Sequence, residues 1–302
     1  MEKIDRITVP ELDQILGHPF KVLDDGFVRL IDYMGSDQSI VQAARVSYGK
    51  GTKKLSEDTG LIRYLLRHQH TTPFEMCELK LHIRVPMDCW RQWIRHRTAN
   101  VNEYSTRYSV AIDSFQKTGK NNWRMQSKQN KQGSDSFISS AEGSELSKKE
   151  LKLHEQIKAI YLERLELGVA REQARKDLPL STYTEAYWKI DLHNLLHFLA
   201  LRMDSHAQRE IRDYANVIGN EIVKRWCPIA WDAFQDYKLS STQFSRFEME
   251  IIKQLVSNNP AEAIELAKTF NFISYDSNGI KKGREAQELE KKITLMGFQI
   301  PW

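Results

Sequence analysis

The segment from Cys77 to Pro86 constrains the fold most, because its apolar and polar residues alternate without interruption. A β-strand directs successive side chains to opposite faces, so this pattern predicts a strand with one buried and one polar face. Pro73 separates the segment from the preceding helix, and Pro86 ends it. The apolar positions are Cys77, Leu79, Leu81, Ile83 and Val85, and the polar positions between them are Glu78, Lys80, His82 and Arg84.

One more strand and a series of helices are expected around this strand. The segment 27–35 alternates loosely and stops at a glycine, which predicts a strand. Apolar residues at helical spacing predict a short helix capped by Ser36 or Asp37, and helices over 59–70, 87–97, 151–168, 168–179 and much of 181–234. The pattern therefore indicates an α+β fold that is dominated by helices and contains a small antiparallel sheet.

Two segments differ from the rest in composition. Residues 117–150 are polar and rich in Ser, Gly, Asn and Gln, which predicts a long loop or a surface insertion. From about residue 238 onward, Lys- and Glu-rich faces predict a helical extension whose role the sequence does not indicate. We therefore expect a main domain over 1–237, with a polar insertion at 117–150, and a C-terminal extension over 238–302.

Composition narrows the class of protein. The formal net charge is only +4 over 302 residues, and 41% of the residues are hydrophobic, so a core is expected and a nucleic-acid coat is not. No stretch approaches the roughly 18 apolar residues of a membrane-spanning helix, and the acidic N-terminus does not resemble a secretory signal. Three cysteines without a CxxC pair argue against a disulfide framework. A cytoplasmic protein without nucleic-acid or membrane partners is expected.

The stretch Arg95–Ser109 concentrates arginines, hydroxyls and a carboxylate. If residues 103–107 ran extended, Glu103, Ser105 and Arg107 would share one face, which could hold a phosphate together with a polar ring edge. The alternative is a solvated charged loop, as most charge runs are. Composition alone leaves these two interpretations nearly even.

Histidines suggest two further candidate positions. His70 lies at a turn before a strand, where ligand contacts are common. His193 and His197 share one face of a predicted helix, whereas Arg202 lies roughly 180° around it. Such a two-faced helix fits a wall between two ligands or a subunit interface. One alternative is that the two histidines have a role in the core. Another is that the protein is a metal-dependent hydrolase in which His206 joins them as a ligand. No familiar spacing of ligands supports a zinc site.

Several motifs in order resemble those of the flavin-dependent thymidylate synthases. Arg95–Arg97 and then Ser105 match the RHR-x7-S signature of that family. Matching segments before and after it are HQHTTPFE, WRQWIRHR, NEYSTRYS, GVAREQARKDLPLSTYT and LALRMDSHAQREI. They cover roughly residues 20 to 235 in the family's order, which makes coincidence remote.

This resemblance implies an activity and an assembly. The family methylates deoxyuridine monophosphate (dUMP) reductively to thymidylate (dTMP), taking the carbon from methylenetetrahydrofolate and using FAD as hydride carrier with NADPH as reductant. Its members adopt the thymidylate synthase-complementing-protein fold and form homotetramers with the sites at subunit interfaces. The catalytic domain would then be residues 1–237.

The resemblance also implies the site residues, with no metal among the cofactors. Arg202 would be catalytic, stabilising the anion of the uracil ring. The expected FAD contacts are His70, Thr72, Arg95, His96, Arg97, Glu103, Asp191, Leu192, His193 and His197. The expected dUMP contacts are Gln92, Trp93, Ile94, Arg95, Glu103, Tyr104, Ser105, Thr106, Arg107, Arg175 and Arg202.

Some residues depart from the family pattern. Thr106 stands where glycine is frequent, and Asp191, His193 and His197 stand where other members have Asn, Arg and Asn. Ser105 has no histidine base beside it in the sequence, so we expect it to hold substrate rather than to attack it. A rival from another class is a module that grips single-stranded RNA through arginines and aromatic rings. Acidic residues mixed throughout argue against that rival.

Overall fold

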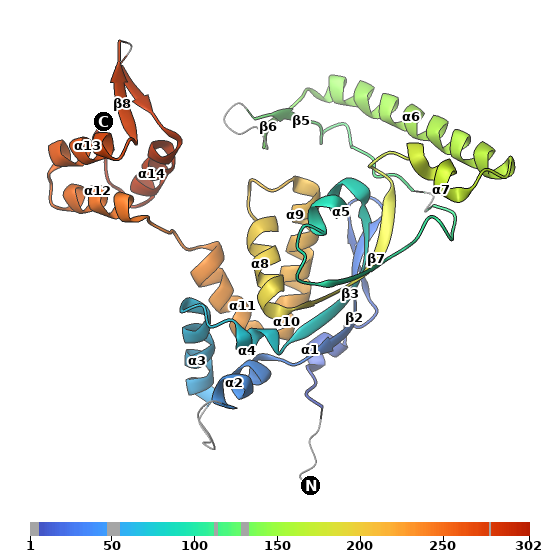
Figure 1. The fold of residues 1–302 in the computed structure, drawn as a ribbon, viewed down its shortest axis with the longest axis horizontal. Coiled ribbons are helices and arrows are strands. Elements are labelled where there is room, and N and C mark those ends of the chain that lie inside the picture. Colours follow the sequence, from blue (N-terminus) through green and yellow to red (C-terminus); the bar gives the residue numbers. More distant parts are fainter. Residues whose placement is uncertain (1–5, 47–54, 112–113, 128–132, 278) are drawn as a thin grey trace, which may run out of the picture. The chain divides into compact units, whose positions relative to one another are not determined.

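The structure is a computed structural model that describes residues 6–46, 55–111, 114–127, 133–277 and 279–302 (Figure 1). The chain divides into two compact units, Met1–Leu239 and Ser240–Trp302. The expected boundary at residue 237 lies within two residues of this division. No helix in the described ranges is both long enough and apolar enough to span a membrane.

The first unit contains the sheet and most of the helices. Its strands are β1 (Pro19–Val22), β2 (Gly26–Met34), β3 (Glu78–Pro86), β4 (Asn100–Glu103), β5 (Arg124–Gln126), β6 (Ser134–Phe137) and β7 (Tyr183–Asp191). Its α-helices are α1 (Pro10–Asp13), α2 (Asp37–Arg45), α3 (Leu55–Arg67), α4 (Thr72–Glu75), α5 (Met87–Trp93), α6 (Ser140–Glu166), α7 (Arg171–Ala174), α8 (Leu192–Arg202), α9 (Arg209–Val217), α10 (Lys224–Trp226) and α11 (Pro228–Phe234). Shorter pieces are the 3₁₀-helix η2 (Arg175–Asp177) and the π-helical turns η3 (Ile218–Val223) and η4 (Gln235–Leu239).

The main sheet has the order β1-β2-β3-β7-β4, and every neighbouring pair is antiparallel. The alternation that predicted β3 is confirmed, because its apolar side chains from Leu79 to Val85 are fully buried while the residues between them are half-buried. The expected strand over 27–35 is β2, and Ser36 caps α2 by accepting a hydrogen bond from the backbone N–H of Gln38. The prediction of a helix-rich α+β fold with a small antiparallel sheet is thus confirmed.

One long prediction of helix was wrong over its first part and confirmed over most of the rest. Within 181–234, which was expected to be largely helical, residues 183–191 form β7 and pair with β3 along its whole length. Ala186, Trp188 and Ile190 are buried and alternate with Glu185, Tyr187 and Lys189. This period of two, together with aromatic residues, suits a central strand. The pattern was present in the sequence but is short beside the helices that follow it.

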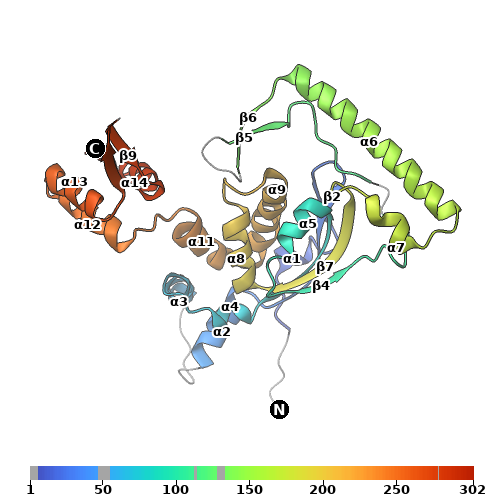
Figure 2. The same ribbon diagram turned by 45° about the horizontal axis from the view of Figure 1, so that its top comes forward.

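Helices α5, α8 and α9 cover one face of the sheet (Figures 1 and 2). Trp93 of α5 packs against Trp188 of β7 and Phe198 of α8, with ring centroids 5.2 and 4.9 Å away. Tyr214 of α9 donates a hydrogen bond of 2.7 Å to the carbonyl oxygen of Arg84 in β3. A Cβ at Gly26 would lie 1.9 Å from the Tyr214 hydroxyl, so only glycine fits there.

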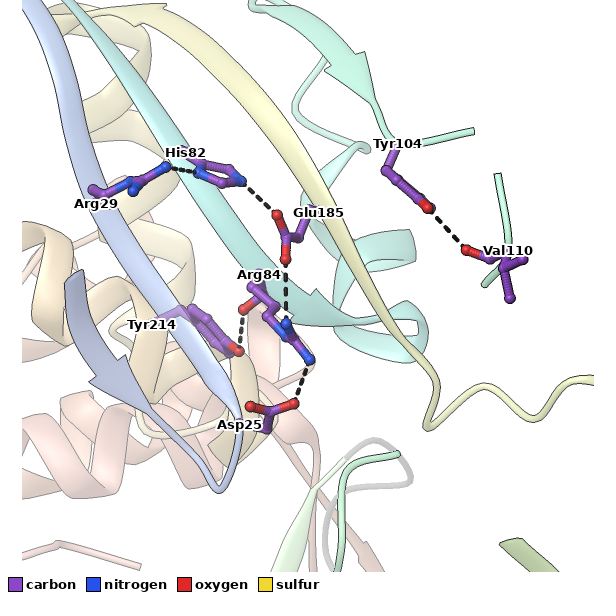
Figure 3. A network of polar contacts seen from close by, with 8 residues as sticks. All are labelled: Asp25, Arg29, His82, Arg84, Tyr104, Val110, Glu185 and Tyr214. Carbon is purple, nitrogen blue, oxygen red and sulfur yellow. Dashed lines mark hydrogen bonds and ion pairs between the residues drawn. The ribbon is translucent and has the colours of Figure 1, made fainter. Parts of the chain in front are cut away.

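The opposite face of the sheet carries a chain of charged side chains (Figure 3). Arg29 donates to Nδ1 of His82 at 2.6 Å, and Nε2 of His82 lies 2.8 Å from Glu185. Arg84 contacts Glu185 at 3.3 Å and also pairs with Asp25. These residues come from three neighbouring strands and the β1–β2 turn, so their ion pairs join the strands through side chains as well as through the backbone.

The polar segment 117–150 is more ordered than a long loop. Strands β5 and β6 pair as a hairpin, although residues 128–132 lie outside the described ranges. Helix α6 begins at Ser140, before the expected start at Leu151, and Ser139 caps it by accepting from the backbone N–H of Glu142. The expectation of a loop up to residue 150 was wrong because polar residues with a good cap can form a helix when the remaining chain holds it. Here Trp123 donates to Ser147 at 3.0 Å.

The second unit has its own apolar core. It contains α12 (Arg246–Val256), α13 (Pro260–Thr269), β8 (Ile273–Asp276), β9 (Gly279–Lys282) and α14 (Arg284–Leu295). Beside its three helices it contains the β8–β9 hairpin, which was not expected. Glu248 of α12 is buried and accepts a 2.6 Å hydrogen bond from Lys292 of α14. This ion pair ties the first and last helices of the unit together.

Candidate functional site

Arg202, the last residue of α8, is fixed by two contacts with the α5 region. Its Nε donates to Nε2 of His96 at 3.1 Å, and its Nη2 donates to the carbonyl oxygen of Gln92 at 3.1 Å. The side chain is half-buried, and burial lowers the pKa of the guanidinium from its ordinary value. The arginine stays charged, because even a lowered pKa of this group remains far above neutrality. A partly desolvated, oriented cation therefore stands at the junction of α5 and α8.

His96 must be neutral to accept a hydrogen bond from Arg202. The pKa of His96 is lowered to about 4, first by burial, then by the charge of Arg202 and by His197. Its ring also packs edge-on against Phe198, with centroids 4.9 Å apart. His96 consequently serves as an acceptor that orients Arg202 throughout the neutral range.

This lowered pKa gives His96 a predictable effect on stability. The folded-state pKa of His96 lies below the ordinary value of 6.5, so the unfolded state binds a proton more readily. The unfolding free energy therefore falls as pH drops from 6.5 towards 4, and His96 does not change it above pH 6.5. We expect wild type to lose about 1 kcal/mol more unfolding free energy than His96→Gln between pH 7.5 and 5, after allowing for solvent screening. Urea unfolding at both pH values measures this, and equal losses would contradict it.

The Gln92 side chain belongs to a second polar chain beside Arg202. Its Nε2 donates a short hydrogen bond to Oε1 of Gln208, the residue that directly precedes α9. Nε2 of Gln208 donates to Oδ2 of Asp88 at 2.9 Å. The sequence reasoning did not select Asp88 or Gln208. Gln208 does stand in the segment LALRMDSHAQREI, so that motif was the available signal.

A cavity of about 300 Å³ lies beside α8. His70, His193 and His197, which were expected near FAD, all line it, and His197 also contacts the ring of His96 with centroids 5.8 Å apart. Thr71 lines the cavity, whereas the expected residue Thr72 does not and is exposed. The remaining lining residues are Leu65, Leu66, Gln69, Phe74, Leu196, Ala200, Phe234 and Lys238.

Two residues of the expected FAD set lie at the start of α8. Asp191 caps α8, accepting from the backbone N–H of Asn194 at 2.9 Å and from its side-chain amide at 2.7 Å. Leu192 is fully buried in the core, and neither residue lines the cavity. They hold the start of the helix that presents His193 and His197.

The loop after β4 turns, so the extended arrangement that the sequence left open for residues 103–107 is not adopted. The extended segment ends at Glu103, and residues 106–108 form a turn, so Glu103, Ser105 and Arg107 do not lie along one strand face. The Ser105 hydroxyl accepts from the backbone N–H of Arg107 at 3.3 Å, and the Tyr104 hydroxyl donates to Val110 at 2.8 Å (Figure 3). Short polar side chains favour such turns over strands.

This loop is tied to α7 and η2 by arginines. Arg175 donates to the Thr106 hydroxyl at 2.6 Å, and Arg107 pairs with Glu172 at 3.2 Å. Glu103 accepts a 2.9 Å hydrogen bond from the hydroxyl of Thr184 in β7. We name Glu103, Ser105, Thr106, Arg107 and Arg175 together the loop group. Within the described residues, no hydrogen bond or ion pair joins the loop group to Arg202 or to the cavity.

The Gln92–Arg97 segment is divided between core and surface. Trp93 is fully buried among aromatic rings, so only its backbone can touch a ligand. Ile94, Arg95 and Arg97 are exposed, and they follow α5, which ends at Trp93 rather than at residue 97 as predicted. Two exposed guanidinium groups beside the Arg202–His96 pair make this surface attractive to anions.

The alternative of a metal site finds no support in the described ranges. His206 pairs with Asp204 at 2.8 Å instead of joining His193 and His197. No three side chains of His, Cys, Asp or Glu in the part of the chain that the structure describes gather closely enough to hold a metal ion.

Comparisons with known proteins agree on one family. Residues 29–229 match the family model described as "Thymidylate synthase complementing protein". Flavin-dependent thymidylate synthases are 52% identical in Wolbachia pipientis wMel (84% of this chain, 89% of the relative) and 48% identical in Rickettsia bellii strain RML369-C (95% and 97%). The UMP/dUMP methylase PolB of Streptomyces cacaoi bound with 5-Br dUMP has a TM-score of 0.66 at 29% identity (74% of this chain, 100% of that chain). This chain therefore belongs to the thymidylate synthase complementing protein family, that of the flavin-dependent thymidylate synthases.

Proposed function

We propose that this protein is a flavin-dependent thymidylate synthase that methylates dUMP to dTMP, with methylenetetrahydrofolate as carbon donor, FAD as hydride carrier and NADPH as reductant. The observation that carries the proposal is the half-buried Arg202, which neutral His96 orients next to a cavity lined by three histidines. The family membership and the relatives' names support the same activity.

Arg202 would activate the nucleotide. Carbon 5 of uracil is a weak nucleophile until the ring gains electron density by losing the N3 proton or by polarisation. A fixed cation in a partly desolvated site stabilises the resulting ring anion without reorganising during the reaction. His96 and the Gln92 carbonyl accept from Nε and Nη2 of the guanidinium, and no described residue hydrogen-bonds its Nη1, which is therefore proposed to face the ring.

The cavity suits part of FAD. Its lining combines apolar walls with His70, His193 and His197, a composition typical of sites for flat aromatic groups. About 300 Å³ would accept one ring system but not the whole dinucleotide, so Arg95, Arg97 and His96 are proposed to hold the remainder. FAD supplies the hydride chemistry when bound, and these residues bind and orient it.

The assembly is proposed to complete the site. The loop group would hold the phosphate and sugar of dUMP, with Arg107 and Arg175 as phosphate ligands, yet in the described residues of one chain no hydrogen bond or ion pair joins it to Arg202. A homotetramer with sites at subunit interfaces would bring the loop group of one subunit to the Arg202 of another. A cytoplasmic location remains part of this proposal.

A visible spectrum and an assay test the function. We expect the purified protein to be yellow, or to become so with FAD, and to form dTMP from dUMP only when methylenetetrahydrofolate and NADPH are both present. A protein that stays colourless with FAD and dUMP and forms no dTMP would overturn the proposal. Tight binding of single-stranded RNA by that protein would then favour the rival RNA-binding module.

A further inference from the structure

We propose that Asp88 and Gln208 are positioning residues that fix which end of the Gln92 amide faces the nucleotide. The proposal rests on the proposed function, because it assigns a role to residues behind one of the expected dUMP contacts. Asp88, Gln208 and Gln92 form a directional chain of hydrogen bonds, here named the amide relay, that ends beside Arg202.

The direction of the amide relay is set at Asp88, and the Glu210 carboxylate also hydrogen-bonds the Gln208 side chain. An ionised carboxylate only accepts hydrogen bonds, whereas a glutamine side chain has an NH₂ end that donates and an oxygen end that accepts. Gln208 therefore turns its Nε2 towards Asp88, 2.9 Å away, and its Oε1 towards Gln92. Gln92 must then donate its Nε2 to Gln208. In the described residues no donor contacts Oε1 of Gln92, so this oxygen is the atom left for a ligand.

Both ends of the amide relay are held in place. The other oxygen of Asp88, Oδ1, accepts from the backbone N–H of Cys89 at 2.7 Å, which fixes the carboxylate at the start of α5. The carbonyl oxygen of Gln208 accepts a hydrogen bond of 3.1 Å from the backbone N–H of Arg212 in α9. Glu210, in the first turn of α9, receives two hydrogen bonds from Arg124 of the β5 strand, at 2.8 and 2.9 Å, and both side chains are mostly buried. The polar insertion thus steadies the helix that carries Gln208.

The consequence is selectivity for a hydrogen-bond donor. A Gln92 amide locked with its oxygen outward accepts from a ligand N–H or O–H group and disfavours a ligand acceptor at the same place. The pyrimidine N3–H and the sugar hydroxyls of dUMP are donors of this kind. A glutamine free to flip would present either end, and would lose that discrimination.

Removing the negative charge at position 88, and then placing it at position 208, tests the proposal. Asp88→Asn keeps an oxygen for the Cys89 N–H but directs an NH₂ group at Gln208, so Gln208 and then Gln92 should reverse. We expect the KM for dUMP to rise about tenfold, which corresponds to the free energy of one lost hydrogen bond. The kcat should change less than about threefold, because Arg202 contacts the backbone of Gln92 and not its amide.

The double variant Asp88→Asn with Gln208→Glu provides the rescue. The carboxylate introduced at position 208 would accept from the new amide at position 88 and from Gln92, which restores the original direction with the same total charge. We expect its KM for dUMP to return to within about threefold of wild type. Asp204→Asn is the matched control, since Asp204 is exposed in the loop before Gln208 and pairs with His206. That variant should keep the wild-type KM.

The outcomes separate this proposal from the proposed function. An unchanged KM in Asp88→Asn would overturn it. So would a raised KM that the double variant fails to reduce, because that result would mean a general loss of structure. Circular dichroism of each variant identifies any that do not fold. Absence of dUMP methylation by the wild-type protein would instead overturn the proposed function, and is seen before any variant is measured.

Discussion

Arg202→Ala is expected to reduce dTMP formation by at least about 10²- to 10³-fold, which is the effect of removing one preorganised charge-stabilising donor. The loss should appear in kcat, because the cation acts on the charge that develops in the uracil ring. Binding of FAD should persist, since Arg202 is not among the residues that line the histidine cavity. Steady-state assays with dUMP, together with the flavin absorption of the purified variant, measure both quantities.

Two further variants make the Arg202 result specific. Arg209→Ala removes an exposed guanidinium at the start of α9 and should leave kcat within about twofold of wild type. Arg202→Lys keeps a positive charge but cannot reproduce the two directed contacts to His96 and Gln92, so it should recover only part of the activity. Near-normal turnover of Arg202→Ala would remove this residue from the mechanism.

The chemistry of the site could be predicted from the sequence to the extent that it depends on residue type and order. The motifs selected Arg202, His96 and Gln92, and the structure joins these three through direct hydrogen bonds. The residues that orient these side chains could not be predicted. Gln208 lies 116 residues from Gln92 along the chain, and only the packing of α9 against α5 brings them together.

The loop group shows the opposite case, in which the sequence left two local conformations open. An extended run through Ser105 and Arg107 was a reasonable hypothesis from alternation alone. The Ser105 hydroxyl instead supports a turn by accepting from Arg107, and Arg175 holds Thr106 from a different element. Side chains that compete with strand pairing for backbone hydrogen bonds therefore determine the conformation of residues 103–107.

The strands of the sheet differ in the same way: one could be predicted from its local sequence, and another depends on a distant partner. Strand β3 could be predicted because its alternation is strict and proline ends it at once. Strand β7 was missed because its alternation is short beside the helices that follow it, and its partner, β3 from Glu78 to Pro86, lies about 100 residues earlier in the chain. Sequence periodicity reports which face is buried, but it does not report the partner.

Trp188→Ala is expected to have the largest effect on stability. Trp188 is fully buried at the centre of β7, with ring centroids 5.2 Å from Trp93 and 5.1 Å from Phe198. Removing a buried indole leaves a cavity and costs about 3–5 kcal/mol of unfolding free energy. Since Trp93 and Phe198 belong to α5 and α8, the same cavity should loosen α8, which ends at Arg202, and α5, which His96 closely follows, and so lower kcat as well. Urea unfolding followed by far-ultraviolet circular dichroism, at one fixed protein concentration, measures the first effect.

Two neighbouring substitutions show whether the effect comes from packing. Tyr187→Ala removes a ring from the other face of the same strand, where Tyr187 is 44% exposed, and should cost less than about 1 kcal/mol. Trp188→Phe should cost less than Trp188→Ala, because it keeps a ring in the cluster and because the indole N–H of Trp188 has no hydrogen-bond partner in the described structure. If Trp188→Ala and Tyr187→Ala destabilised the protein equally, the aromatic cluster would not be what joins the sheet to the site.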